Sequence, residues 1–314
     1  MVKQIIKKYI NKLPYFKTLA KESEQYKELV KEIDIYKTTF PPGHYYSPII
    51  AKEEIAKRAN EIFSIKSNKI TGVNLNEEEQ VDLLNKLAEN YSALPFSEEE
   101  KSGLRYYYNN NFYCHSDAIF LSLIIQHFKP GSIIEVGSGY SSAVMLDTNE
   151  LFFDNKIKIT FIEPYPEERL FKLFKPADKI NNQTLISNLQ DTNLDLFDKL
   201  NANDILFIDS THVSKTGSDV NHILFEILPG LKSGVLVHFH DIFYPFEYPK
   251  DWVLKWNGFG WNESYILKAF LMHNDDYKIL MFNTFLEHFH KDWFEENMPL
   301  CLENEGGSIW IQKL

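Results

Sequence analysis

The chain has 314 residues, of which 44% are hydrophobic and 25% charged, as in an ordinary globular protein. Its formal net charge of −11 argues against nucleic acid or an anionic membrane as a general partner, because both attract basic surfaces. The two cysteines, Cys114 and Cys301, are too few for a disulfide framework or a structural zinc site. They favour a reducing compartment, and we expect a cytoplasmic protein.

Residues 1–115 are rich in Lys and Glu and predict a helical cap, with helices near 15–38, 51–63 and 76–91. The basic, amphipathic segment 1–19 is interpreted as a docking helix, with weak peripheral membrane contact as the alternative. No apolar run approaches the ~20 residues that a membrane-spanning helix needs. The aromatic segment 105–117 is interpreted as a hinge that packs the cap onto the next domain, with a lid over a ligand as the alternative.

Strands and helices alternate from residue 116 to residue 314, which predicts a second domain over this range. We expect strands at 132–136, 158–162, 184–187, 204–208, 234–238, 277–282 and 308–312, and helices at 118–127, 141–147, 220–228 and 262–272. Such alternation predicts an α/β fold: a Rossmann-like, doubly wound and mostly parallel sheet. The last two strands are expected to form a late antiparallel excursion.

The first strand of this domain ends in a glycine turn that enters a helix. The turn runs Glu135-Val136-Gly137-Ser138-Gly139-Tyr140-Ser141. A strand, a glycine turn and a helix N-terminus together form a nucleotide pocket at the carboxyl edge of a parallel sheet. The dinucleotide fingerprint requires a third glycine, and this chain has Ser142 there.

Two further segments follow strands at the same predicted edge. Glu163 ends the second strand, where a carboxylate can accept hydrogen bonds from a ribose diol. Gln190 and Asp191 follow the third strand, where a side-chain acceptor can bind an adenine amino group.

These residues together resemble the cofactor site of class I S-adenosylmethionine-dependent methyltransferases. The resemblance implies that Glu135, before the glycine turn, faces the methionine part of the cofactor and that Glu163 binds the ribose. The implied cofactor-binding set is Glu135, Gly137, Ser138, Gly139, Tyr140, Ser141, Glu163, Gln190 and Asp191. More broadly, residues 70–314 resemble a group of bacterial class I methyltransferases whose substrates are mostly unassigned.

The fourth and fifth strands end in polar segments that contain Asp209, His212, His240 and Asp241. A buried strand that ends in a carboxylate is costly unless the charge meets a partner, and a divalent cation is one such partner. Asp209 and Asp241, with His240, form a partial set of metal ligands. His238 alternates with Phe239 inside the strand and is expected to be structural.

This edge is similar to that of the metal-dependent, catechol-type O-methyltransferases. The resemblance places Asp209 as the first metal ligand, His240-Asp241 at the ligand pair, and His212 where the family has its catalytic lysine. A neutral imidazole, with a pKa near ~6.5, is a competent base at neutral pH. Histidine in place of the usual acid at 240 weakens the case for Mg²⁺ and leaves room for a softer divalent cation.

The sequence therefore predicts methyl transfer from S-adenosylmethionine to an oxygen of a small-molecule or sugar-containing acceptor, with or without a divalent metal. His212 and Asp209 are the expected catalytic residues. Three alternatives stay open: an NAD(P)-dependent oxidoreductase, a metal-dependent oxygenase using His238-x-His240-Asp241, and a non-catalytic binding module with the same fold.

Overall fold

The structure is a computed structural model that describes residues 14–35, 40–256 and 259–314. The chain divides into two compact units: Met1–Arg58 with Trp256–Gly260, and Ala59–Lys255 with Trp261–Leu314. The smaller unit contains α2 (Pro14–Ile35) and α3 (Lys52–Lys57). Most of the amphipathic segment expected at 1–19 lies outside the described residues. Where the structure describes the chain, no helix is both long and apolar enough to cross a bilayer.

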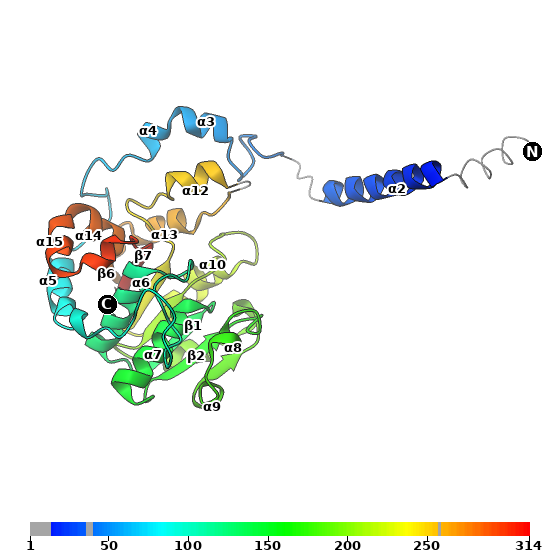
Figure 1. The fold of residues 1–314 in the computed structure, drawn as a ribbon. Coiled ribbons are helices and arrows are strands. Elements are labelled where there is room, and N and C mark those ends of the chain that lie inside the picture. Colours follow the sequence, from blue (N-terminus) through cyan, green and yellow to red (C-terminus); the bar gives the residue numbers. More distant parts are fainter. Residues whose placement is uncertain (1–13, 36–39, 257–258) are drawn as a thin grey trace, which may run out of the picture. The chain divides into compact units, whose positions relative to one another are not determined.

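A seven-stranded sheet forms the centre of the larger unit (Figure 1), in the order β3-β2-β1-β4-β5-β7-β6. Strands β1 to β5 pair in parallel, and β7 runs antiparallel to both of its neighbours. The Rossmann-like sheet with a late antiparallel strand is therefore confirmed. The strands are β1 (Ser132–Val136), β2 (Lys158–Ile162), β3 (Gln183–Leu185), β4 (Ile205–Ile208), β5 (Leu236–His240), β6 (Tyr277–Phe282) and β7 (Ser308–Lys313).

The register of the central strands aligns the residues that follow them. Val136 pairs with Ile162 on one side and with Ile208 on the other. Ile208 pairs in turn with Phe239. Because the strands are parallel, the next residues, Gly137, Glu163, Asp209 and His240, all emerge at the same edge. The strand order changes direction between β1 and β4, where open α/β sheets bind their ligands.

Helices cover both faces of the sheet. Helix α6 (His115–Phe128) packs against α5 (Glu77–Ala88) and α7 (Tyr140–Phe153). The connection from β4 to β5 begins with α10 (Asp219–His222), continues through a π-helical turn, η4 (Ile223–Ile227), and ends with α11 (Leu228–Gly230). This crossover runs away from β1 in the direction opposite to that of α7, so right-handed connections place the two helices on opposite faces.

Shorter helices connect the remaining elements of the larger unit. They are α4 (Ala59–Ile62), η1 (Tyr91–Ala93), α8 (Leu170–Leu173), α9 (Asp178–Asn181), η2 (Leu189–Asp191), η3 (Leu194–Lys199), α12 (Lys250–Lys255), α13 (Glu263–Leu271), α14 (Asn283–Phe289), α15 (Lys291–Asn297) and η5 (Pro299–Leu302).

Three expected elements differ from those observed. The third strand, expected at 184–187, lies at 183–185. The helix expected at 51–63 is divided at Arg58 into α3 and α4. The fifth strand lies at 236–240 instead of 234–238, because Gly234 adopts a φ of +86°. A Cβ at Gly234 would lie 2.5 Å from that of Ala202, so this position belongs to a tight loop. The shift makes His240 the last residue of β5.

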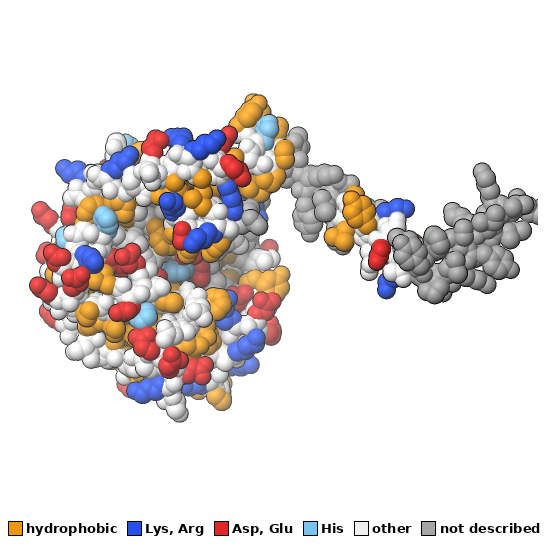
Figure 2. All heavy atoms as spheres, turned by 45° about the horizontal axis from the view of Figure 1, so that its top comes forward, with side chains coloured by type: hydrophobic (Ala, Val, Ile, Leu, Met, Phe, Trp, Pro, Cys, Tyr) orange, Lys and Arg blue, Asp and Glu red, His pale blue; other side chains and the backbone are white. Residues whose placement is uncertain are grey.

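Residues 59–115, expected in the cap, share the larger compact unit with the sheet. Gln80 on α5 accepts a 2.7 Å hydrogen bond from the backbone of Phe282. The side chain of Arg105 is 3% exposed and forms ion pairs of 2.6 Å with Asp147 and 2.7 Å with Asp178. Figure 2 shows acidic side chains scattered over the visible face of this unit, in keeping with the net charge.

Candidate functional site

The glycine turn after β1 packs directly against the end of β4. Gly137 has a φ of +76°, and a Cβ there would lie 2.2 Å from the carbonyl oxygen of Asp209. Its backbone N–H donates to Ile162 at 3.1 Å, and that of Asp209 donates to Val136 at 2.9 Å. No other residue can occupy position 137 without moving the tip of β4.

Glu135 is completely buried and anchors the start of α7. Its carboxylate accepts hydrogen bonds from Ser141 Oγ at 2.6 Å and Ser142 Oγ at 2.5 Å. Burial raises the pKa of Glu135 to about 8, against the opposing effect of the two serines. Ser142 also accepts a 3.1 Å hydrogen bond from the backbone of Gly139. The serine at the place of the third glycine therefore holds the turn to the strand.

A cavity of about 250 Å³ opens between the ends of β1, β2 and β4. Glu163 lines it and accepts hydrogen bonds from Ser138, at 3.1 Å from N and 3.0 Å from Oγ. Gln190 also lines the cavity, with its amide donating to Gly217 at 2.8 Å, whereas Asp191, the next residue, is exposed. The lining residues are Val136, Gly137, Ile162, Glu163, Pro164, Asn188, Leu189, Gln190, Asp209, Ser210, Thr211 and Asp219.

Asp209, His212 and Asp241 converge where β4 and β5 end. His212 Nε2 lies 3.4 Å from Asp209 Oδ1 and 3.5 Å from Asp241 Oδ2. The other ring nitrogen, Nδ1, lies 2.8 Å from Glu263 Oε2. Glu263 is the first residue of α13, is 1% exposed, and also accepts two hydrogen bonds from Ser210. Three carboxylates therefore surround one imidazole.

Two residues of the cluster have a left-handed backbone conformation that residues other than glycine rarely adopt. His212 has a φ of +59° and Asp241 a φ of +56°, each costing ~1–2 kcal/mol. The carbonyl of His212 accepts from the backbone N–H groups of Asn262, at 3.0 Å, and Glu263, at 3.2 Å. The N-terminus of α13 therefore fixes both the backbone and the ring of His212.

The charges of the cluster change the pKa of each member. Burial lowers the pKa of His212, but its contacts with Asp209 and Glu263 outweigh this and raise the pKa well above its usual value. Burial raises the pKa of Asp209, but His212, His240 and Arg169 outweigh this and lower it. Burial dominates at Asp241 and raises its pKa. The contacts with Asp209 and Glu263 therefore favour the imidazolium form of His212.

The remaining histidines of β5 lie behind the cluster. His240 Nε2 is 3.7 Å from Asp241 Oδ1, and its ring packs 5.2 Å from that of Tyr113. His238 is fully buried and stacks on Phe207 with ring centroids 3.9 Å apart. Among the described residues, neither ring nitrogen of His238 has a hydrogen-bond partner, and burial lowers its pKa well below the usual value. His238 is thus a neutral packing residue away from the cluster.

The cluster has the donors of a divalent-cation site. Ligand atoms of Asp209, His212 and Asp241 all lie within 4.8 Å of one another. Two carboxylates and one imidazole suit Mn²⁺, Fe²⁺ or Zn²⁺ better than Mg²⁺, which prefers oxygen ligands. The Glu263 contact at Nδ1 is the arrangement that orients metal-bound histidines. His240, expected among the ligands, stands outside this group of three, beside Asp241.

Aromatic side chains border the cluster at His212. The ring of Trp261 lies 4.2 Å from that of His212, and Trp252 lies 5.9 Å from Trp261. Phe243 packs against Trp252 at 5.2 Å. These three side chains therefore form an aromatic row that begins at the imidazole.

Segment 105–117 reaches the glycine turn. Tyr107 Oη lies 3.2 Å from Tyr140 Oη, and the ring of Phe112 stacks on that of Tyr140 at 6.0 Å. The guanidinium of Arg169 lies 4.4 Å from the Phe112 ring centroid. The segment expected to be a hinge therefore lies beside the glycine turn.

Sequence reasoning missed Glu263, Asp219 and Arg169. Asp219 lines the cavity and accepts hydrogen bonds from both the backbone and the hydroxyl of Thr211, at 2.8 and 2.6 Å. Glu263 and Asp219 each begin a helix, where acidic residues are common for local reasons. That signal is too ordinary to mark a site.

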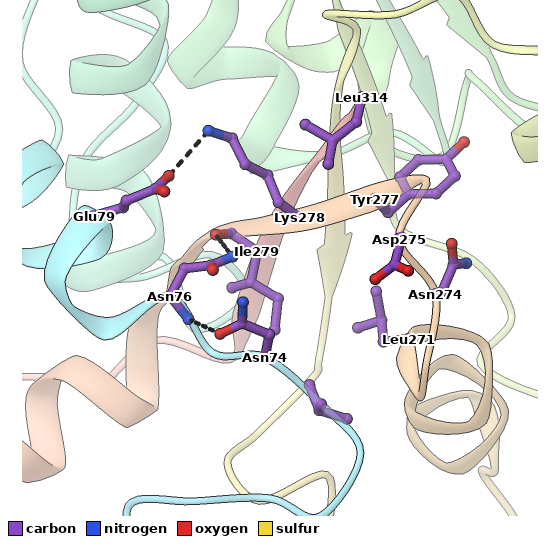
Figure 3. Close-up of a pocket in the computed structure, with 11 residues that line it drawn as sticks. Asn74, Asn76, Glu79, Leu271, Asn274, Asp275, Tyr277, Lys278, Ile279 and Leu314 are labelled. Carbon is purple, nitrogen blue, oxygen red and sulfur yellow. Dashed lines mark hydrogen bonds and ion pairs between the residues drawn. The ribbon is translucent and has the colours of Figure 1, made fainter.

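A second hollow, of about 320 Å³, lies at the start of β6 (Figure 3). Lys278 forms a 3.0 Å ion pair with Glu79, and Asn76 donates to the carbonyl of Ile279 at 3.3 Å. Because β6 runs parallel to β5, this hollow lies at the edge of the sheet opposite the glycine turn. Its polar contacts attach α5 to the sheet.

A family model described as a methyltransferase domain matches residues 134–242, from β1 past the end of β5. An uncharacterized protein of Archaeoglobus fulgidus is 35% identical over 170 residues, which are 52% of this chain and 75% of that protein.

Similar solved structures include the methyltransferase PaMTH1 of Podospora anserina bound to S-adenosylhomocysteine (TM-score 0.42, 16% identity, 85% of this chain and 99% of that chain). The O-methyltransferase TomG from Streptomyces achromogenes, in complex with S-adenosylmethionine, has a TM-score of 0.40 and 12% identity over 84% of this chain and 99% of that chain. An O-methyltransferase from Bacillus cereus has a TM-score of 0.38 and 12% identity over 84% of this chain and 100% of that chain.

The strand order defines a Rossmann-like α/β fold, and the glycine turn and the acid after β2 lie at the edge where such sheets bind their ligands. With the family match across these elements, the chain belongs to the class I S-adenosylmethionine-dependent methyltransferases. Membership of this class implies S-adenosylmethionine as the methyl donor.

Proposed function

We propose that this enzyme transfers the methyl group to an oxygen of a small-molecule acceptor, with His212 and Asp209 at the reaction centre. The observation that carries the proposal is the placement of His212: Glu263 holds Nδ1, while Nε2 faces Asp209 and Asp241. Asp209 belongs both to this cluster and to the wall of the cavity beside the glycine turn. The two features therefore supply adjoining sites for acceptor and methyl donor.

Under this proposal the cofactor lies along the cavity. Glu163 binds the ribose, Gln190 and Asp191 flank the adenine, and the amino-acid part crosses the glycine turn. That last part of the site comprises Gly137, Ser138, Gly139, Tyr140 and Ser141, with Glu135 beneath it. Glu135 acts indirectly, because both of its oxygens already accept from Ser141 and Ser142.

The reaction is an in-line displacement at the methyl carbon. A bond forms between the acceptor oxygen and the methyl group, the bond from the methyl group to sulfur breaks, and the sulfonium becomes a neutral thioether. The acceptor hydroxyl must lose its proton, and neutral His212 takes it on Nε2. Glu263 and Asp209 then stabilise the imidazolium. The site needs the acceptor oxygen ~3 Å from the methyl carbon.

Asp209 and Glu263 favour the imidazolium form of His212, which must lose a proton before the ring can act as a base. A sulfonium that binds beside Asp209 brings a positive charge close to His212, and like charges disfavour the imidazolium. Under this proposal, cofactor binding lowers the pKa of His212 and so favours its neutral form as the base.

A divalent cation at the cluster is a second version of the same proposal. Asp209, His212 and Asp241, with His240 nearby, would hold it, and a bound cation lowers the pKa of an acceptor hydroxyl. This version uses Nε2 of His212 as a ligand, whereas the first version uses it as a base. Metal dependence therefore separates the two.

The aromatic row beside His212 supports an acceptor with a planar ring or a sugar ring. Trp261 provides a face 4.2 Å from the imidazole, and such faces stack on phenols and on the apolar faces of sugars.

A cytoplasmic location belongs to the same proposal. The free thiols of Cys114 and Cys301 support it.

The test combines cofactor binding with methyl transfer. Calorimetry should show that S-adenosylhomocysteine binds and NADH does not; no binding of S-adenosylhomocysteine at millimolar concentration would contradict the proposal. Labelled methyl transfer to a panel of phenols and glycosides should identify an acceptor. His212→Ala should then lower turnover by ~10²–10⁴-fold with cofactor binding retained. His127→Ala, at the end of α6 before β1, is the matched control.

A further inference from the structure

Arg169 lies over the glycine turn. It immediately precedes α8, in the segment that follows β2 and Glu163. A Cβ placed on Gly139 would lie 3.0 Å from both Cδ and Nη1 of Arg169, so the side chain fills the space that glycine leaves open. The guanidinium also stacks on Phe112, whose side chain is 61% exposed.

The charge of Arg169 is uncompensated by direct contact. The sequence has three arginines in a chain of net charge −11. Arg105 is surrounded by Asp147, Glu150 and Asp178. Within the part of the chain that the structure describes, Arg169 forms no ion pair or hydrogen bond, and its ring contact with Phe112 holds the guanidinium at the turn. A planar guanidinium held in this way matches a carboxylate, which it binds through two parallel hydrogen bonds.

If the proposed function is right, Arg169 lies where the amino-acid end of the cofactor binds. The sulfonium sulfur of S-adenosylmethionine carries three substituents: the ribose, the methyl group and the amino-acid chain. Glu163 marks the ribose and Asp209 the reacting methyl group. The third wall of the site is the glycine turn, so the amino-acid chain passes over Gly137 and Gly139, toward Arg169.

We propose that Arg169 binds the carboxylate of the cofactor's amino-acid part and that Phe112 positions its guanidinium. Arg169 is therefore a cofactor-binding residue, selective for ligands that keep the amino-acid chain. The same contact accounts for a glycine at 139, because a larger residue would displace the guanidinium.

The experiment compares two ligands that differ only in this part. S-adenosylhomocysteine has the amino-acid chain, whereas 5′-methylthioadenosine keeps the adenosine and sulfur and has a methyl group instead. Calorimetry on the full chain should show that Arg169→Ala weakens S-adenosylhomocysteine binding at least ~10-fold and changes methylthioadenosine binding less than ~2-fold. Arg169→Lys keeps the charge but loses the planar pair of N–H donors. Its affinity for S-adenosylhomocysteine should lie between those of the unaltered protein and Arg169→Ala.

Lys172→Ala is the control, because it removes an equal charge from an exposed position in the same segment. It should change neither affinity. Equal weakening of both ligands by Arg169→Ala, or no weakening of S-adenosylhomocysteine, would overturn the role of Arg169 and leave the proposed function intact. If the unaltered protein binds neither ligand, the proposed function fails together with this inference.

Discussion

Nδ1 of His212 lies 2.8 Å from Oε2 of Glu263, 51 residues further along the chain. This contact leaves Nε2 as the nitrogen that faces Asp209 and Asp241. Helix α13 therefore decides which side of the imidazole faces the two aspartates. Under the proposed function, Glu263 acts through His212 as a positioning residue.

Glu263→Gln should lower kcat by about 10²-fold, with little change in the affinity for S-adenosylhomocysteine, because the imidazolium loses a negative partner. Glu263 raises the pKa of His212, so the same variant should also lower that pKa. A ¹⁵N-histidine NMR titration measures this directly. A purely structural role for Glu263 predicts loss of folding or cofactor binding instead. Glu226→Gln, on the turn between α10 and α11, provides the comparison.

The pH dependence of catalysis should reflect the raised pKa of His212. Because the base must be neutral, kcat/KM should rise with pH and level off above the pKa of His212. That pKa is raised above its ordinary value of ~6.5. Asp209→Asn removes a partner that raises this pKa, so the NMR titration of His212 should move to lower pH. Asp154→Asn, at an exposed site, should leave it unchanged. A shift to higher pH in Asp209→Asn would contradict the assignment.

His212 should also link stability to pH. Its folded-state pKa is raised above the unfolded value of ~6.5, so it stabilises the fold below that pH, and the stabilisation is lost as pH rises through the folded pKa. Denaturant unfolding across this range should show the loss in the unaltered protein and a smaller one in His212→Ala. An equal pH dependence of stability in both proteins would show that a group other than His212 causes it.

Cation binding should follow the donor set of the cluster. We expect Mn²⁺ or Zn²⁺ to bind more tightly than Mg²⁺, because one ligand is an imidazole. Asp241→Ala should weaken this binding at least ~10-fold, and Asp251→Ala, an exposed acid, should not. Calorimetry on protein dialysed against a chelator provides the measurement. Full activity after dialysis, with no cation binding, would favour His212 as the base.

The buried charges around Arg105 should matter for stability. Arg105→Leu leaves Asp147 and Asp178 buried without their partner, which should lower the free energy of unfolding by ~3–5 kcal/mol. Urea unfolding followed by circular dichroism measures the loss. Lys156→Ala breaks an exposed pair with Asp154 and should have little effect. A similarly small effect of Arg105→Leu would mean that water reaches the buried carboxylates.

Much of the fold was predictable because its signals are local. The apolar runs that became β1, β2 and β4 ended at the expected acids or glycine, and parallel strands end at one edge. The boundaries of β5 were wrong by two residues, because the tight contact of Gly234 with Ala202 is not visible in the sequence. The grouping of 59–115 with the sheet arises from contacts such as Arg105 with Asp147, which join distant segments.

The sequence alone determined the order of strands and helices, the glycine turn, and the presence of Asp209, His212 and Asp241 at strand ends. These depend on periodicity and on backbone chemistry, which neighbouring residues set. Only the tertiary structure decided that His212 stands among three carboxylates and that Arg169 covers the turn. Both facts depend on segments brought together across the sheet, and the pKa of His212 is set by those through-space charges.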